Sequence, residues 1–510
     1  MLTYESKVKD LQALPELLSP SRQESKKVVL CHGVFDPLHI GHIRHFEQAK
    51  KLGDILVVTV TPDKYVNKGP HRPAFTEDLR VEAIAALNCV DYAAVNRWPT
   101  AEETIKLLRP DYYVKGPDYR SDERDRTGGI VSERAAVDAV GGQSAFTSDI
   151  TFSASNLVNQ HLPVFPPAVS QYLASFTSRY SADDVLGYLD RACSLKVLVV
   201  GETIIDEYVY CQTLGKSGKE PVLATRHLSS EKFAGGIVAV ANHVSGFSDR
   251  VGLLTFLGSA NSQEDFVRGK LAPNVDETFL YMDGNAPTIV KRRFVESYPF
   301  QKLFELYEME EDGDSPAHSQ ALCGKLEELL PEYDLAIVTD YGHAMLGPEA
   351  VEILCSRANF LAVNTQANAG NRGFNTISKY RHADYICLSE AELRLEARSR
   401  VKDVKDIIRD VSERLSCSQM VVTQGQHGSL CYSRQDGFFD VPALAIGVVD
   451  RIGAGDAVLS LTALCAAQGA PIEVSGFVGN VAGSQAVASV GHRQSIGRVP
   501  FSRHVESLLK

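Results

Sequence analysis

Residues 27–42, KVVLCHGVFDPLHIGH, begin with a β-type apolar run and end in two histidines at the start of an amphipathic stretch, HIRHFEQAKKLG (42–53). Apolar runs and amphipathic stretches then alternate: DILVVTV (54–60), TEDLRVEAIAALN (76–88), YAAVN (92–96), TAEETIKLL (100–108) and YYVKG (112–116). This alternation predicts an α/β fold with a doubly wound parallel sheet. Ligands of such sheets bind beyond the carboxyl ends of the strands, which is where the two histidines lie.

The chain has 510 residues, which is too long for one hydrophobic core, and a second α/β series opens at KVLVVGE (196–202). We predict a leading helical segment over residues 1–26, a first α/β domain over 27–160 and a second over 195–500. Between the two domains, residues 161–194 contain three prolines followed by a helical pattern, which indicates a semi-rigid connector.

The composition narrows the class of partner. Of the residues, 44% are hydrophobic and 23% are charged, and the formal net charge is −12. This acidity disfavours nucleic acid as a partner, whereas small phosphorylated ligands need only a few local cations. The ten cysteines form no C-x-x-C pair and no zinc spacing, which is typical of a reducing cytosol. The sequence has no apolar run of membrane length, so we predict a cytoplasmic protein without membrane contact.

The two histidines of the opening stretch are candidate catalytic residues. His39 and His42 lie three residues apart where the first strand gives way to a helix. There their N–H donors and the helix N-terminus can stabilise the charge that builds on the α-phosphate of a nucleoside triphosphate during in-line displacement. Gly41 between them lets the nucleotide approach the backbone. Two alternatives stay open on this pattern alone: the histidines could simply begin the helix, or they could bind a metal.

The string GVFDPLHIGH (33–42) resembles the cytidylyltransferase-like nucleotidyltransferases, which make nucleotide-diphosphate alcohols and sugars. The resemblance continues through KGPDY (115–119) and covers about residues 27–160. It implies that Lys115 holds phosphate and that Arg72 and Arg80 line the substrate side, although a surface ion pair explains either arginine better when it is taken alone. KGPDY is more similar to heptose-phosphate adenylyltransferases than to cytidylyltransferases, which favours ATP over CTP and a sugar phosphate as acceptor. The nucleotide contacts implied by the resemblance are Gly33, Phe35, Asp36, Gly41, Ser153 and Ser155.

The second domain carries a glycine-rich turn, DRIGAGD (450–456), that leads into the apolar helix AVLSLTALCAA (457–467). Glycines in such a turn let successive backbone N–H groups, here of Gly453, Ala454 and Gly455, converge on an anion at the helix N-terminus. Asp456 can then accept the proton of a substrate hydroxyl as that hydroxyl attacks a γ-phosphate. The alternative role for Asp456 is that of a helix cap.

Four further motifs occur in the order and rough spacing of ribokinase-type (PfkB) carbohydrate kinases: GETIID (201–206), Gly235-Gly236, DYG (340–342) and Ser389-Glu390. Within that family, VGETIIDEYVY (200–210), KSGKEPVLA (216–224) and VTDYGHAML (338–346) are most similar to the kinase of the bifunctional heptose-phosphate kinase/adenylyltransferases, whose domain order is the reverse of this one. The resemblance implies a ribokinase-like α/β domain with a small β lid, Mg²⁺ and ATP as cofactors, and a homodimer.

The same resemblance implies roles for particular residues of the second domain. Glu390 would order Mg²⁺ through water, and no direct metal ligand is identified. Lys291 and Arg293 would bind a phosphate of the substrate. The candidate contacts to the sugar are Asp206, Gly235, Gly236, Asn242 and Asp340.

This sequence departs from the kinase pattern at three places. The asparagine after the double glycine is replaced by Ala239, with Asn242 three residues on; the asparagine of N-x-x-E is Cys387; and residues 364–366 read Asn-Thr-Gln in place of Asp-Pro-Lys. We therefore keep three hypotheses: a bifunctional kinase and nucleotidyltransferase for a sugar phosphate, a cytidylyltransferase for a polyol or amino-alcohol phosphate fused to its kinase, and a nucleotidyltransferase with a non-catalytic kinase-like module.

Four isolated histidines are predicted to be structural or on the surface, namely His243, His343, His427 and His492.

Overall fold

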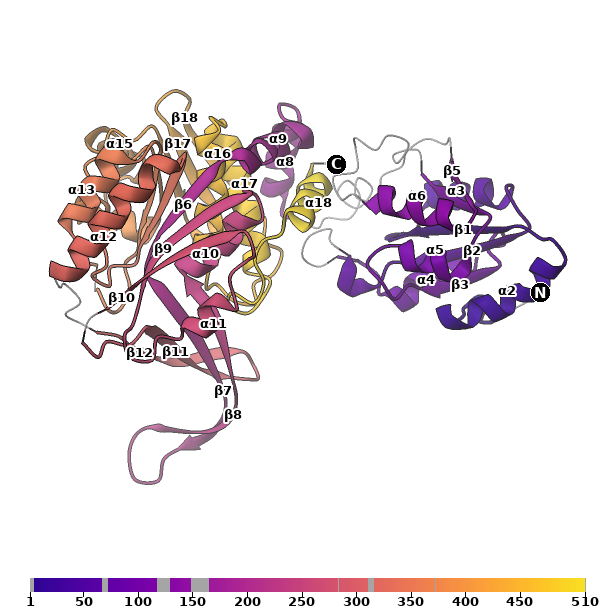
Figure 1. The fold of residues 1–510 in the computed structure, drawn as a ribbon, viewed down its shortest axis with the longest axis horizontal. Helices are drawn as coiled ribbons and strands as arrows, with labels where there is room; N and C mark the ends of the chain where they lie inside the picture. Colours follow the sequence, from indigo (N-terminus) through magenta and orange to yellow (C-terminus); the bar gives the residue numbers. More distant parts are fainter. Residues whose placement is uncertain are drawn as a thin grey trace. The chain divides into compact units, whose positions relative to one another are not determined.

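The chain folds into two α/β units, which confirms the predicted fold class (Figure 1). The structure is a computed structural model that describes residues 4–66, 72–116, 129–147, 165–282, 284–310, 316–371 and 373–509. The first unit comprises Met1–Pro166 together with Val499–Lys510, and the second comprises Pro167–Arg498.

The first unit is built on a five-stranded parallel sheet in the order β3-β2-β1-β4-β5. The chain runs outward from β1 to β3 and then returns to place β4 on the other side of β1. The switch point therefore lies between β1 and β4, where an open parallel sheet leaves a crevice at the carboxyl ends of its strands. The strands are β1 (Val28–Gly33), β2 (Ile55–Val60), β3 (Tyr92–Val95), β4 (Tyr112–Lys115) and β5 (Gln143–Phe146).

Alternate residues of the central strand face two separate cores. Val28 and Leu30 pack with α2, α5 and α6 on one face, whereas Val29 and Cys31 pack with α3 and α4 on the other. Because both faces are covered, β1 reads in the sequence as a continuous apolar run. The helices of this unit are α1 (Tyr4–Lys7), α2 (Leu14–Gln23), α3 (Ile40–Lys50), α4 (Glu77–Ala85), α5 (Glu102–Leu108), α6 (Gly129–Ala139) and, from Val499 on, α18 (Arg498–Leu508).

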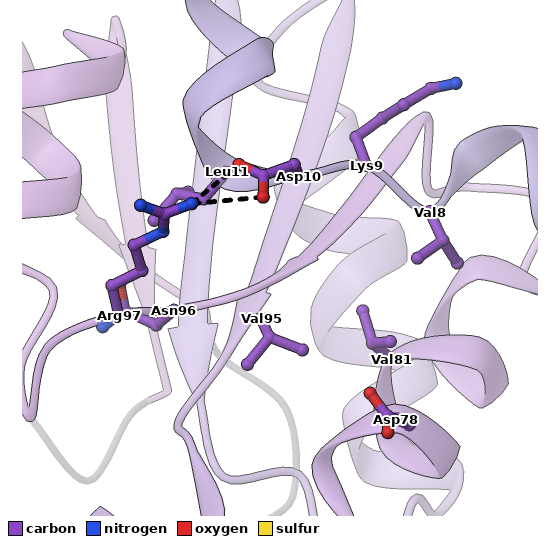
Figure 2. Close-up of a pocket in the computed structure, with 9 residues that line it drawn as sticks. All are labelled: Val8, Lys9, Asp10, Leu11, Asp78, Val81, Val95, Asn96 and Arg97. Carbon is purple, nitrogen blue, oxygen red and sulfur yellow. Dashed lines mark hydrogen bonds and ion pairs between the residues drawn. The ribbon is translucent and has the colours of Figure 1, made fainter.

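The N-terminal segment closes the β3 edge of this sheet. Val8 forms a parallel bridge with Ala93, and the Lys9 N–H donates to the Ala93 carbonyl at 2.9 Å. A hollow of about 480 Å³ lies between this segment, the end of β3 and α4 (Figure 2). At its rim the Arg97 guanidinium donates to both carboxylate oxygens of Asp10 at 3.2 Å. Because β2 separates this edge from β1, the hollow is distinct from the crevice between β1 and β4.

The second unit contains a nine-stranded sheet in the order β10-β9-β6-β13-β14-β15-β16-β17-β18. Its pairing is parallel from β10 to β16, and β17 and β18 are antiparallel additions at one edge. The strands are β6 (Lys196–Gly201), β9 (Arg250–Leu257), β10 (Val275–Tyr281), β13 (Leu335–Asp340), β14 (Leu361–Thr365), β15 (Tyr385–Ser389), β16 (Gln419–Thr423), β17 (Ser429–Ser433) and β18 (Gly437–Val441).

Helices cover both faces of this nine-stranded sheet (Figure 1). On one face α12, α13, α14 and α15 contribute to a large apolar cluster, and on the other α10, α16 and α17 pack against the strands. All ten residues from Ala457 to Ala466 in α16 are buried, which explains why this helix is apolar all round. The helices are α10 (Ile237–Ser245), α11 (Glu264–Arg268), α12 (Pro316–Leu329), α13 (Pro348–Arg357), α14 (Glu390–Glu396), α15 (Val404–Arg414), α16 (Ala454–Ala467) and α17 (Ile472–Ala486).

A separate four-stranded sheet, β12-β11-β7-β8, forms the predicted β lid of the second unit. β7 and β8 are a long antiparallel hairpin that reaches away from the nine-stranded sheet (Figure 1). β7 begins two residues after β6 ends, so the lid is joined directly to the main sheet. The lid strands are β7 (Thr203–Lys216), β8 (Leu223–Gly236), β11 (Ile289–Glu296) and β12 (Gln301–Glu308).

The segment predicted as a connector contributes two helices to the second unit, α8 (Pro167–Thr177) and α9 (Ala182–Arg191). Phe176 stacks on Phe477 of α17 with ring centroids 4.5 Å apart. Arg179 donates to the buried carboxylate of Glu473 at 2.7 Å. From Pro167 on, this segment is therefore packed as part of the second unit and is not a spacer.

Candidate functional sites

The H-x-G-H turn of the first unit brings two imidazoles to the start of α3. His39 is the N-cap residue of this helix, and its Nδ1 accepts a hydrogen bond from the Gly41 N–H at 3.0 Å. The rings of His39 and His42 stack with their centroids 3.8 Å apart. Both rings therefore lie at the positive end of the helix and next to the carboxyl end of β1, where an anion is favoured.

Phe35, which the sequence predicts to be a nucleotide contact, packs against the His42 ring of the histidine pair. Its backbone has φ = 53°, and its buried ring makes edge contacts with the rings of His42 and Phe46, at 5.3 and 4.9 Å between centroids. A Cβ at Gly33 would lie 3.0 Å from the Phe35 ring, so the glycine leaves room for it. The Phe35 side chain packs against His42 from the core, and a nucleotide contact of Phe35 stays a prediction.

Lys115 ends β4 and lies beside the same crevice. Its Nζ is 3.0 Å from the buried carboxylate of Glu133 on α6 and 3.4 Å from the His32 carbonyl. Glu133 also accepts hydrogen bonds from the Tyr113 hydroxyl at 2.9 Å and the Ala101 N–H at 3.0 Å. Burial acts to raise the pKa of Glu133, but Lys115, His32 and the Ala101 N–H hold that pKa below its ordinary value. Sequence reasoning missed Glu133, because its neighbours in the chain carry no motif.

Arg80, whose contact with substrate stays a prediction, makes several hydrogen bonds within the protein. Its guanidinium is 2% exposed and donates to the carbonyls of Val34, Thr61 and Phe75 at 2.7–3.0 Å. It also pairs with Asp63 at 2.5 Å. Through these hydrogen bonds the guanidinium connects the loops that contain Val34, Thr61 and Phe75. Arg80 therefore stabilises the loops around the crevice from inside the protein.

Asp36, also predicted as a nucleotide contact, fixes the loop that carries Arg72. Its buried carboxylate accepts from the N–H groups of Ala74 and Phe75 at 2.6 and 3.0 Å. Arg72 is half-buried, and burial lowers the pKa of its guanidinium while Asp36 opposes that effect. Arg72 therefore remains a candidate for an anionic substrate, whereas the Asp36 side chain is structural. Two other predicted contacts lie outside the described residues, namely Ser153 and Ser155.

In the second unit, the glycine-rich turn presents Asp456 in the first turn of α16. Gly453, the N-cap of this helix, has φ = 81°, and a Cβ there would lie 2.2 Å from the His492 ring. Only glycine fits this position without strain. The Asp456 carboxylate accepts a hydrogen bond from the Tyr341 hydroxyl at 2.8 Å, and burial raises the pKa of Asp456. A raised pKa suits a carboxylate that accepts a proton during a reaction.

His492 lies between two candidate carboxylates, which the sequence did not predict. Its Nε2 is 3.6 Å from Asp206 Oδ2 and 4.0 Å from Asp456 Oδ2, and its side chain is only 6% exposed. The sequence suggested a structural or surface role because the three residues are far apart in the chain. The fold brings them together, so His492 belongs to the candidate site.

Asp206 lies on the lid strand β7 and has several close neighbours. Arg293 pairs with Asp206 and also, at 3.0 Å, with Glu305. A Cβ at Gly235 would lie 2.2 Å from Asp206 Oδ2, so glycine is needed for this approach. Lys291 is buried nearby, and burial lowers the pKa of its ammonium while Asp206 opposes that effect. Arg293 thus holds Asp206 through an ion pair, and its role as a phosphate ligand stays a prediction.

Asp450 joins the lid to the glycine-rich turn. Its buried carboxylate accepts from the Tyr208 hydroxyl of β7 at 2.5 Å and from Lys302 of β12 at 2.6 Å. It also accepts from the N–H groups of Ile452 and Gly491 at 3.2 and 3.1 Å. One carboxylate therefore fixes two lid strands, the turn and the residue before His492.

Asp340, predicted as a sugar contact, is also used within the protein. It accepts from Lys379 at 2.7 Å, from the Tyr380 hydroxyl at 3.0 Å and from the Gly342 N–H at 3.1 Å. Glu202 beside it accepts from two backbone N–H groups, and burial followed by the charge of Asp340 raises the pKa of Glu202 to about 7. Asp340 thus organises the loop after β13, and its contact with a sugar stays a prediction.

Asn242 likewise differs from its predicted contact with the sugar. α10 starts after Gly236, whose φ is 55°, and Asn242 lies near the end of this helix. Its amide donates to the Lys270 carbonyl at 2.8 Å and accepts from the Ala272 N–H at 2.9 Å. The amide therefore anchors a loop, and a contact of Asn242 with a sugar stays a prediction.

Glu390 is the residue predicted to order Mg²⁺ through water, and that role stays a prediction. It begins α14, and its carboxylate accepts from Gln424 at 2.8 Å and from Arg394 at 2.7 Å. The bond from Gln424, opposed by burial and aided by Arg394, holds the pKa of Glu390 below its ordinary value. Among the described residues, no group of three or more His, Cys, Asp or Glu could hold a metal ion directly.

Comparison with known proteins identifies both units. The pfkB family carbohydrate kinase model matches residues 194–497, which is more than half of the chain. This chain belongs to the pfkB family of carbohydrate kinases. The cytidylyltransferase-like family matches residues 30–150, in front of the PfkB domain.

Relatives of this PfkB protein include several named bifunctional protein HldE. The one from Syntrophotalea carbinolica is 42% identical over 120 residues, which cover 23% of this chain and 24% of that protein. The one from Geobacter sulfurreducens is 32% identical over 164 residues, which cover 32% of each protein. The matched region thus spans only a quarter to a third of these curated relatives.

Among solved structures, a mutant of phosphofructokinase-2 from Escherichia coli superposes with a TM-score of 0.50 at 13% identity, over 62% of this chain and 100% of that chain. This likeness concerns the fold alone. Within the described ranges, none of the helices has the length and apolar character needed to cross a membrane.

Proposed function

We propose that this chain is a bifunctional enzyme of nucleotide-sugar synthesis. Its PfkB domain phosphorylates a sugar phosphate at the anomeric hydroxyl, which gives a sugar bisphosphate. Its cytidylyltransferase-like domain transfers an adenylyl group from ATP to the sugar 1-phosphate that remains after a separate phosphatase has hydrolysed the other phosphate ester. The observation that carries the proposal is the meeting of Asp206, His492 and Asp456 at the glycine-rich turn of a PfkB domain. The bifunctional HldE relatives support it for the first unit.

In the kinase step, the acceptor hydroxyl gives its proton to Asp456 while its oxygen attacks the γ-phosphorus of ATP. A bond forms between that oxygen and phosphorus, the bond to the β-phosphate oxygen breaks, and ADP leaves. Asp456 suits this role because burial raises its pKa and the Tyr341 hydroxyl orients it. The N–H groups of the 453–455 turn stabilise charge on the transferred phosphoryl group.

The sugar is held on the opposite side of Asp456 by the lid. Asp206 and His492 bind its hydroxyls, and the close packing at Gly235 and Gly236 lets it approach the backbone. Mg²⁺ offsets the charge of the ATP phosphates when bound, and Glu390 suits its hydration shell because its carboxylate is ionised and partly exposed.

In the nucleotidyl transfer, an oxygen of the sugar 1-phosphate attacks the α-phosphorus of ATP. The bond between that phosphorus and the bridging oxygen breaks, and pyrophosphate leaves. His39, His42 and the N-terminus of α3 stabilise the charge that builds on the α-phosphate, and Lys115 neutralises a neighbouring phosphate. Arg72 holds the sugar phosphate.

A ³¹P NMR assay of the full-length chain tests both activities. The protein is mixed with Mg²⁺, ATP or CTP, and a panel of sugar phosphates and sugar 1-phosphates that includes heptose 7-phosphate. We expect ATP to give a new diphosphate ester and pyrophosphate. Asp456→Asn should stop ADP formation but leave pyrophosphate release from a supplied sugar 1-phosphate, and His42→Ala should do the reverse.

The same assay separates the alternatives. Turnover of glycerol 3-phosphate with CTP above that of every sugar phosphate would make the first unit a polyol-phosphate cytidylyltransferase. Unchanged ATP consumption in the Asp456→Asn variant would make the second unit a non-catalytic binding module.

We also propose a cytoplasmic homodimer that pairs through the lid. Leu214, Leu223 and Phe304 of the lid are 54–65% exposed. Apolar side chains on an open sheet favour pairing with another chain. Light scattering after size-exclusion chromatography should give twice the chain mass, and Leu223→Glu should give monomers; a monomeric wild type would contradict this arrangement.

A further inference from the structure

The carboxylate of Asp450 lies between the lid and the glycine-rich turn, and only 1% of its side chain is exposed. Two donors reach it from the lid: the ammonium of Lys302 on β12, at 2.6 Å from Oδ1, and the hydroxyl of Tyr208 on β7, at 2.5 Å from Oδ2. Two backbone N–H groups complete the set, those of Ile452 at 3.2 Å and Gly491 at 3.1 Å. A buried carboxylate needs such donors because it has lost its water.

Lys302 supplies the positive charge of this group. Among the residues that the structure describes, it is the only cation within ion-pair distance of Asp450. Burial acts to raise the pKa of Asp450, but the bonds from Lys302 and Tyr208 hold that pKa below its ordinary value. The carboxylate is therefore ionised at neutral pH while Lys302 is in place, and the ammonium offsets its charge.

Lys302 reaches Asp450 as part of a packed cluster on the lid. Its Nζ lies over the Tyr208 ring, 5.6 Å from the centroid. That ring makes an edge contact with Phe233 of β8 at 5.2 Å and stacks on Phe300 at 6.5 Å between centroids. The two donors from the lid are therefore held together, so a movement of the lid strands carries both of them toward the carboxylate or away from it.

On the other side, Asp450 fixes two backbone segments of the proposed kinase site. Its bond with the Ile452 N–H holds the start of the turn, one residue before Gly453, whose φ is 81°. Its bond with the Gly491 N–H holds the residue before His492. Hydrogen bonds to an ionised acceptor are stronger than those to a neutral one, so both bonds weaken if Asp450 loses its charge or its place.

The same lid strands hold the proposed sugar site. Asp206 precedes Tyr208 by two residues on β7, so the two side chains lie on one face of the strand. Arg293, which pairs with Asp206, lies on β11, the strand with which β12 is paired. A sugar bound at Asp206 therefore restrains the lid strands that carry Tyr208 and Lys302.

We propose that Lys302 is a positioning residue for the kinase reaction: through Asp450 it couples the lid that holds the sugar to the glycine-rich turn that binds the γ-phosphate of ATP. A bound sugar orders the lid, the lid holds Lys302 on Asp450, and Asp450 holds the turn in place for the phosphate. The inference rests on the proposed kinase activity and adds the contact through which each substrate raises the affinity for the other. Because such coupling is reciprocal, both affinities rise by the same factor.

The first test measures this coupling by isothermal titration of the full-length protein with heptose 7-phosphate. The titration is done with and without Mg²⁺ and an ATP analogue that has an imido group between its β- and γ-phosphates. It reads the kinase unit, because under the proposed function the first unit takes a sugar 1-phosphate. We expect the analogue to lower the Kd of the wild type at least about fivefold, and the Lys302→Met variant to reduce this factor to less than about twofold. The Kd without analogue should stay nearly unchanged, because Lys302 acts on the turn.

Arg292→Met is the matched control. Arg292 lies on the lid strand β11, its side chain is 28% exposed like that of Lys302, and it pairs with Glu207 at 2.9 Å. This variant should keep the coupling factor of the wild type. A wild type without coupling, or a Lys302→Met variant that retains the wild-type factor, would overturn the proposal.

Hydrogen exchange followed by mass spectrometry tests the contact without any substrate. In the unliganded full-length protein, peptides that contain Ile452 and Gly491 should exchange at least about tenfold faster in Lys302→Met than in the wild type, because their N–H groups lose a charged acceptor. Peptides of α12, on the other face of the nine-stranded sheet, should exchange at the same rate in both proteins.

The exchange measurement also separates this proposal from the proposed activity. If heptose 7-phosphate bound to neither protein but the turn still exchanged faster in the variant, the proposed kinase substrate would be wrong and the action of Lys302 on the turn would stand. Equal exchange in the turn would refute that action whatever the activity. Faster exchange in α12 as well would mean that Lys302 only stabilises the unit as a whole, which would refute it too.

Discussion

Replacing Glu133 with glutamine removes one charge from a buried ion pair and keeps the shape of the side chain. The amide oxygen of glutamine can take the place of Oε1 and accept from the Ala101 N–H, but its NH₂ group then takes the place of Oε2 and cannot accept from the Tyr113 hydroxyl. Glutamine no longer offsets the ammonium of Lys115, whose Nζ lies 3.0 Å away. The two side chains are 12% and 6% exposed, so water cannot replace the lost carboxylate unless the structure opens.

The expected loss of stability follows from this burial. Removing one partner of a buried ion pair costs about 3–5 kcal/mol. We expect about 3 kcal/mol, at the lower end of that range, because the His32 carbonyl, 3.4 Å from Nζ, remains as an acceptor. At roughly 2–4 °C per kcal/mol for a unit of this size, the unfolding midpoint should fall by roughly 6–12 °C.

The stability that the Glu133→Gln variant loses should depend on pH and should become smaller in acid. The pKa of Glu133 in the folded protein lies below its ordinary value. Its stabilising contribution is therefore complete above the ordinary glutamate value of about 4.3 and disappears as the pH falls through the lowered pKa. The difference between wild type and variant should be constant near neutral pH and should shrink only in acid below that value.

Tryptophan fluorescence measures this effect in the first unit alone, because Trp98 is the single tryptophan of the chain and lies in that unit. Glu102→Gln is the matched control, since it removes an exposed carboxylate 2.7 Å from Lys106 and should change the free energy of unfolding by less than about 0.5 kcal/mol. A Glu133→Gln midpoint within about 1 °C of the wild type would refute the reasoning.

Asp456→Asn should lower kcat for ADP formation by about 10²–10⁴-fold in a coupled assay, and a smaller loss would contradict its role as the base. Tyr341→Phe removes a hydrogen bond that lowers the pKa of Asp456, so the acid limb of the kcat profile should move to higher pH. A purely structural Tyr341 would leave that limb in place. Gly453→Ala places a Cβ 2.2 Å from the His492 ring, on a backbone with φ = 81°. It should therefore reduce kcat/KM for ATP at least about tenfold. Unchanged ATP kinetics would show that the turn can accommodate the added methyl group.

The sequence predicts those parts of the fold that depend on local pattern. The apolar runs at 28–33 and 55–60 became β1 and β2, because strands covered on both faces need continuous apolar residues. The two anion-binding turns were also predicted, since a glycine-rich turn or H-x-G-H stretch before a helix is recognisable within ten residues. His39, His42 and Asp456 lie where the sequence placed them, at helix starts.

Partners distant in sequence could not be predicted in the same way. Glu133 on the helix α6 meets Lys115 at the end of the strand β4, and His492 meets Asp206 across 286 residues. Nothing next to Glu133 or His492 in the sequence marks its role. The partners of charged residues within a motif could not be predicted for a related reason. Arg80 and Arg293 bind carboxylates and carbonyls that come from other elements of the fold.

These pairings also explain how a chain with a net charge of −12 can bind phosphorylated ligands. In the first unit, Glu133 holds Lys115 at the crevice through a buried pair, so the position of the cation is fixed before any ligand binds. In the second unit, Asp450 fixes the glycine-rich turn, whose N–H groups carry no net charge at all. Under the proposed function, local geometry sets the affinity for phosphate, and the net negative charge disfavours larger polyanions. Removing a carboxylate next to either site should consequently weaken phosphate binding, although it makes the protein less acidic.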